Sequence, residues 1–160
     1  MIDDLIRPFT FVSALACGLM GGFFFAFSAC VMRALARLPA SAGIAAMQSI
    51  NIVVINPMFL TVFLGTSALS VALSIFSLLR LEQPGATYTL IGSLLYLVGS
   101  VLVTFVFNVP RNNVLAALEP SKAEAASIWT EYVQIWTAWN HVRTIAALAA
   151  ALSFSIALYY

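Results

Sequence analysis

Charged side chains are scarce in this 160-residue sequence: Asp, Glu, Lys and Arg make up 8% of it, and 62% of the residues are hydrophobic. A soluble domain has about 25% charged and roughly 45–50% apolar residues. A chain of this size could not bury so much apolar surface away from water. The composition therefore excludes an ordinary soluble domain and makes the lipid bilayer the first expected partner. The net charge of +1, without any basic run, also argues against nucleic-acid binding.

Residues that carry redox or metal chemistry are equally scarce. Cys17 and Cys30 are the only cysteines; on one helix they would lie about 20 Å apart, too far for a disulfide. The absence of a Cys-x-x-Cys pair excludes a membrane thiol oxidoreductase. His141 is the only histidine, and a metal site commonly needs three or four ligands. The sequence thus predicts no metal site and no cofactor, although a haem with His141 as its sole axial ligand stays open.

Long apolar runs dominate the rest of the chain. A helix of roughly 20 apolar residues crosses the ~30 Å core of a bilayer. No Asp or Glu lies within the four runs of that length, which excludes small exporters that use a buried acid for proton coupling. We therefore expect one all-α domain over residues 1–160, a four-helix transmembrane bundle. Its predicted spans are about residues 8–32, 57–79, 88–107 and 137–160.

The three links between these runs differ in length. Pro84-Gly85 predicts a tight turn after Arg80, whereas the other two links are longer, partly helical and on one side of the bundle. Ser121 and Glu124 form a capping-box pattern in the second of them. Five basic residues flank the long links and two lie on the opposite side, which predicts cytoplasmic links and external termini. The acidic start at Asp3 and Asp4 argues against a signal peptide.

Hydrogen-bonding side chains gather where the long links meet the spans. Unpaired polar groups are costly at membrane depth, so they should face one another or water. The sequence therefore predicts that they form one pocket. The residues are Gln48, Asn51, Asn56, Asn108, Arg111, Asn112, Asn113, Asn140, His141 and Arg143.

Helical periodicity divides the segment before the last span into two stripes, at about 100° per residue. Aromatic residues lead to Asn140 and Arg143 on one stripe, while His141 lies on the adjacent one. The first stripe consists of Trp129, Tyr132, Trp136, Asn140 and Arg143, and the second of Thr130, Gln134, Thr137, His141 and Thr144. An aromatic wall beside a polar row suits a flat hydrophobic small molecule. An aromatic belt at the membrane–water boundary is the structural alternative.

Four strings of the sequence carry a family resemblance. They are Gly-Phe-Phe-Phe-Ala-Phe-Ser at 22–28, Ile-Asn at 50–51 with Asn-Pro at 56–57, Phe-Asn-Val-Pro-Arg-Asn-Asn at 107–113 and Trp-Thr-Ala-Trp-Asn-His-Val-Arg-Thr at 136–144. In these strings and their order, the chain resembles the anthrone-oxygenase-like integral membrane proteins. The family's fungal members oxidise polycyclic anthrones to anthraquinones with molecular oxygen and no evident cofactor. Most bacterial members have no assigned function.

The resemblance implies roles for individual residues. His141 would act as the general base, because histidine exchanges protons near neutral pH. Arg111 or Arg143 would hold the substrate anion, and Trp136 and Trp139 would wall its rings. Asn108, Asn112 or Asn140 would donate hydrogen bonds to the developing oxyanion, with Asn51 and Asn56 as further substrate contacts.

The same pocket would also serve a protein that is not an enzyme. Such a protein would bind a lipid or a hydrophobic metabolite, or form a subunit of a larger membrane assembly, and a homo-oligomer is open in either case. An oxygenase consumes oxygen with its substrate, whereas a binding protein saturates without turnover. The sequence alone does not choose between these two classes.

Overall fold

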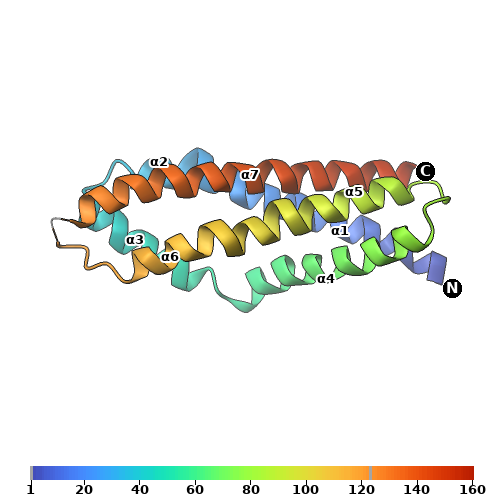
Figure 1. Ribbon diagram of the computed structural model, residues 1–160, viewed down its shortest axis with the longest axis horizontal. Coiled ribbons are helices and arrows are strands. Elements are labelled where there is room, and N and C mark those ends of the chain that lie inside the picture. The colour runs from blue at the N-terminus through green and yellow to red at the C-terminus, as the bar shows by residue number, and fades with distance from the viewer. Residues whose placement is uncertain (1, 123) are drawn as a thin grey trace.

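Four helical columns run side by side along an elongated bundle (Figure 1). The computed structural model describes residues 2–122 and 124–160, and these contain helices and no strand. The first column comprises α1 (Ile2–Ala26), the wide π-helical turn η1 (Phe27–Val31) and α2 (Met32–Leu35); the second comprises α3 (Ala40–Val53) and α4 (Pro57–Leu79). The third comprises α5 (Ala86–Tyr96), η2 (Leu97–Leu102), η3 (Thr104–Asn108) and α6 (Val109–Ala116); the fourth is α7 (Ala125–Tyr159). The predicted all-α bundle is confirmed.

Each column contains a helical stretch long and apolar enough to cross a bilayer, so the chain is an integral membrane protein. These stretches are Ile6–Leu35, Pro57–Leu79, Ala86–Ala116 and Ala125–Tyr159. The second matches the predicted span, while the other three extend beyond theirs. The third column continues through Asn108 and Pro110, because the wide turn η3 directly before Pro110 already departs from the regular i→i−4 bonding that the missing N–H would interrupt. The partly helical link predicted before residue 137 is continuous with the last span in α7.

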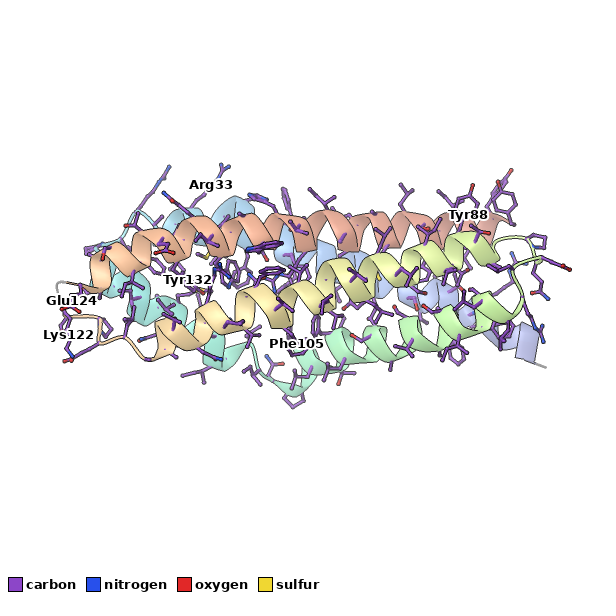
Figure 2. The ribbon with its side chains drawn as sticks, in the orientation of Figure 1. Arg33, Tyr88, Phe105, Lys122, Glu124 and Tyr132 are labelled. Atoms are coloured by element: carbon purple, nitrogen blue, oxygen red, sulfur yellow. The ribbon has the colours of Figure 1, made fainter. Side chains whose placement is uncertain are left out.

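The two chain ends lie at one end of the bundle, together with the turn between α4 and α5 (Figure 1). The links that join α2 to α3 and α6 to α7 lie at the opposite end (Figure 1), hereafter the link end. Figure 2 shows Lys122 and Glu124 at the link end and Tyr88 at the other. This is the expected arrangement of links and termini along the bundle. Gly85 makes the short turn possible, because its φ is +80° and a Cβ there would lie 2.7 Å from the Ala157 carbonyl oxygen.

Accessibility labelling should place the two ends of the bundle on opposite sides of the membrane. In a Cys30→Ser background, Gln83→Cys should label from outside the cell and Ser121→Cys only from the cytoplasm. Both positions are exposed, and neither substitution changes a basic residue that sets the orientation. Cys17 is buried and should stay silent. Labelling of both new cysteines from the same side would contradict this topology.

The second column is interrupted at residues 54–56, and Asn56 joins its two parts. The Asn56 Oδ1 accepts a hydrogen bond from the Phe59 backbone N–H at 3.0 Å, and its Nδ2 donates to the Val53 carbonyl at 2.9 Å. Asn56 is thus the N-cap of α4, and Pro57 occupies the first position after it. One Asn-Pro pair therefore ends α3 and starts α4.

Two apolar clusters pack the bundle on either side of this interruption. The cluster toward the termini contains Phe24, Phe63, Tyr96 and Phe154, all nearly fully buried. The cluster at the link end contains Ile44 and the aromatic residues Trp129, Tyr132 and Trp136, among others. The polar residues of α7 that follow Trp136 lie where the two clusters meet.

Candidate substrate cavity

A cavity of about 340 Å³ opens beside the interruption of the second column, and all four columns contribute to its wall. This volume lies within the range of about 300–1,000 Å³ that small-molecule sites occupy. Its aromatic lining comprises Phe23, Phe24, Phe27, Phe59, Phe63, Phe105 and Trp136. Its polar lining comprises Asn51, Thr104, Asn112, Asn140 and Arg143. An apolar body with a polar edge fits such walls.

Arg143 is the charged group of this cavity, and it is only 6% exposed. Its Nη1 donates to the Thr104 hydroxyl at 3.1 Å, and its Nη2 donates to Asn140 Oδ1. The guanidinium carbon lies 4.4 Å from the ring centroid of Phe24 and 5.1 Å from that of Trp136. Its Nε is buried without a hydrogen-bond partner. No carboxylate of the described residues pairs with Arg143, so the cavity holds a buried cation without a counter-ion.

Asn140 sets the position of that cation. It is fully buried, and its Nδ2 donates to the Phe24 carbonyl at 2.7 Å and to the Ser28 hydroxyl at 2.6 Å. A carbonyl only accepts hydrogen bonds, so the orientation of the Asn140 amide is determined and its oxygen faces Arg143. Phe24 lies in the last turn of α1 and Ser28 lies in η1, where a π-helical turn replaces the regular i→i−4 bonding. Such wide turns often occur at functional sites.

Asn112 and Asn51 add hydrogen-bond donors. The Asn112 Oδ1 accepts from Trp136 Nε1 at 2.8 Å and from the Tyr132 hydroxyl at 2.9 Å. Since an indole N–H only donates, these contacts fix the amide and leave Asn112 Nδ2 without a protein partner among the described residues. Asn51 lies beside the Tyr132 hydroxyl, and its buried Nδ2 has no hydrogen bond of good geometry. The cavity therefore offers spare N–H donors, which suit an acceptor-rich or anionic ligand.

Asn108 supports the cavity from behind. It is 1% exposed and does not line the cavity; its Nδ2 donates to the Trp136 carbonyl at 3.2 Å. Its Oδ1 is buried without a hydrogen-bond partner. Asn108 and Asn112 are one helical turn apart, so both face α7. The contact of Asn108 is with the backbone of α7, and that of Asn112 is with its side chains.

The single cluster expected from the sequence is found for Asn51, Asn112, Trp136, Asn140 and Arg143, which line the cavity. Asn108 belongs to it as well, although it lies behind the cavity wall. The expectation does not hold for Gln48, which donates to the Leu115 and Leu118 carbonyls at 2.8 and 3.0 Å, or for Asn113, which is exposed. Four further site residues also lie elsewhere. Arg111 lies in a separate cleft with Glu131 and donates to the Phe107 carbonyl of its own column at 2.7 Å. Trp139 stacks on Phe107 outside the cavity, and Asn56 caps α4.

His141 is the fourth residue that lies elsewhere. Its side chain is exposed and does not line this cavity, because it follows Asn140 by one residue and so points about 100° away around α7. Among the described residues, no group of three or more His, Cys, Asp or Glu side chains could hold a metal ion. Thr104 was not predicted, because its small hydroxyl sits at a wide turn that no local pattern indicated. Phe24, Phe27 and Ser28 were visible only as part of the phenylalanine-rich string at 22–28.

The fold and cavity together define a class: an integral membrane helical bundle with an aromatic-lined site and a buried cation that has no counter-ion. The family model described as anthrone oxygenase matches residues 55–153, and the chain belongs to that family. The match includes Asn108, Asn112, Trp136, Asn140 and Arg143, and so most of the polar side of the cavity. No curated protein and no solved structure matches the chain.

Proposed function

We propose that this protein is a cofactor-independent oxygenase that oxidises a flat, anthrone-like aromatic substrate within the membrane. The observation that carries the proposal is Arg143, a buried guanidinium without a counter-ion in an aromatic cavity. A bound anion would complete this arrangement, and the anion of an anthrone is the electron-rich form that reacts with oxygen. Membership of the anthrone oxygenase family supports the same chemistry.

The reaction converts a ring methylene and molecular oxygen into a ring carbonyl and water. The substrate first loses a C–H proton, which leaves an anion delocalised onto its oxygen. The anionic carbon then bonds to dioxygen, and the resulting peroxide takes up a proton. Loss of the second methylene hydrogen and cleavage of the O–O bond release water and leave the C=O bond. The substrate supplies all the electrons that oxygen receives, so the balance requires no further reductant.

The residues of the cavity would act on the anion. Arg143 favours the ionised substrate electrostatically, and it does so more strongly in an apolar cavity than in water. Asn51 and Asn112 would donate to the substrate oxygens with their free Nδ2 groups, and Trp136 would pack on the rings. Neither a carboxylate nor an imidazole lines this cavity. The proposal therefore requires a substrate acidic enough to ionise without a protein base, its proton leaving to water.

Oxygen consumption by the purified protein in lipid nanodiscs tests the proposal. With anthrone, we expect one oxygen molecule consumed for each anthraquinone formed, at a rate well above that in empty nanodiscs. Saturable anthrone binding without faster oxygen uptake would instead support the class of proteins that bind a lipid or hydrophobic metabolite without turnover.

Replacement of His141 by glutamine tests the alternative base. Because the imidazole is exposed and outside the cavity, His141→Gln should keep the oxygen consumption rate within about twofold of wild type. This variant also serves as a control for substitutions in the cavity. Loss of a general base typically lowers the rate by about 10²–10⁴. A fall of that size in a folded His141→Gln protein would restore the base role and remove the need for a self-ionising substrate.

A further inference from the structure

A second hollow adjoins the cavity on the outside of the bundle. It is a groove of about 580 Å³ between α1, the end of α3 and the start of α4. Its rim includes the exposed apolar side chains of Leu19, Val53 and Met58, so it opens on a surface that would face lipid. Ser49 and Asn56 are its polar lining residues, and Asn56 already uses both polar atoms to join α3 to α4. The groove thus offers almost nothing to hold a polar group.

The groove and the cavity share part of their lining. Phe23, Phe27, Ile50, Val54 and Phe59 contribute to both. The Phe23 ring centroid lies 4.9 Å from that of Phe27 and 5.3 Å from that of Phe59. These rings lead from the groove toward Trp136, whose ring centroid is 5.9 Å from that of Phe27. One continuous aromatic path therefore connects an apolar, lipid-facing hollow to the cavity that contains Arg143.

We propose that these two hollows form one bipartite site, and that the natural substrate carries an apolar tail. The aromatic ring system lies in the cavity with its anionic oxygen toward Arg143, and the tail runs past Phe23 and Phe59 into the groove. This inference rests on the proposed function, because it names the substrate class of the same site. It also gives the substrate a lateral route from the bilayer.

The tail should contribute selectivity more than affinity. A tail that moves from lipid into an apolar groove exchanges one apolar environment for another, so it gains little hydrophobic free energy. Obstruction of the groove has a larger effect, because the tail of a substrate whose ring system is bound in the cavity would then clash with protein. Obstruction of the groove is therefore the sharper experiment.

The experiment compares two isotope-labelled probes in nanodiscs: anthrone, and an anthrone with a decyl chain on the ring edge away from its oxygen. Val53→Trp and Ser49→Trp obstruct the groove from α3 at residues that do not line the cavity. Ile52→Trp is the matched control, since Ile52 is 75% exposed on the same helix and lines neither hollow. The ratio of the two Kd values is compared between variants, because the greater partitioning of the decyl probe into lipid is the same in every variant and cancels in that comparison.

In both obstructed variants, we expect the Kd for the decyl probe to rise roughly tenfold or more, and the Kd for anthrone to stay within about twofold. Ile52→Trp should change neither. If every variant binds the decyl probe as the wild type does, the groove holds bilayer lipid and the bipartite site is wrong, while the proposed function stands. If the wild type binds neither probe, the proposed function itself fails.

Discussion

Arg143→Gln should lower anthrone-dependent oxygen consumption by a factor of about 10²–10³, the usual cost of losing a preorganised donor to a developing anion. The guanidinium supplies the charge of the cavity and lies within 4.4 Å of the Phe24 ring centroid. Glutamine can still hydrogen-bond to Thr104 or Asn140 but cannot offset a negative charge. The affinity for the ionised substrate should therefore fall together with the rate.

Arg111→Gln is the matched control, because it removes the same charge from a cleft outside the cavity. Its oxygen consumption should stay near that of wild type. Arg143→Lys keeps the charge but loses the planar fork that reaches Thr104 and Asn140 together, so an intermediate rate is expected. Size-exclusion profiles and near-ultraviolet circular dichroism would verify that each variant is folded. Wild-type oxygen consumption in a folded Arg143→Gln protein would rule out Arg143 as the anion-holding group.

Asn140→Leu should destabilise the bundle by about 2–4 kcal/mol. Asn140 is fully buried and connects three groups: the Phe24 carbonyl, the Ser28 hydroxyl and the Arg143 guanidinium. Leucine provides apolar volume but satisfies none of them, and it leaves a buried cation with one partner fewer. The free energy of unfolding in mixed micelles, followed by tryptophan fluorescence, measures the loss.

Asn113→Leu provides the comparison, since Asn113 is exposed on α6. A surface substitution of this kind should stay within about 0.5 kcal/mol of wild type. Equal stabilities of Asn140→Leu and the wild type would mean that the connection between α7 and η1 does not hold the bundle together. The anion site would then require another support.

Most of the fold could be predicted from apolar run length. Four long apolar runs predict four spans, and an even number of spans places both termini at one end. The Pro84-Gly85 pair predicts the short turn. The span boundaries could not be predicted, because polar residues continue inside the helices. Asn108 and Pro110 resemble a helix end in sequence, yet the third column runs through them. Asn108 instead donates to the Trp136 carbonyl of α7, a distant partner that no local pattern indicates.

Part of the site could be predicted from helical periodicity. The stripe of Trp129, Tyr132, Trp136, Asn140 and Arg143 follows from helical periodicity, and all five residues are buried. His141 was predicted as the base on chemical grounds, although it belonged to the neighbouring stripe; the geometry places it on the exposed face. Thr104 and Ser28 could not be predicted, because their position depends on wide turns set by contacts with distant parts of the chain.

The two wide turns of the third column, η2 and η3, affect how a change in length would alter the angular register of α6. Each π-helical turn holds one additional residue in about the space of a regular turn, so loss of that residue would return the turn to regular α-helix and leave the orientation of α6 largely unchanged. In a regular helix the same loss would rotate the helix beyond it by about 100° and turn Asn112 away from Trp136. Within the family, a relative shorter by one residue in this segment can therefore keep both the membrane bundle and the contact between Asn112 and Trp136.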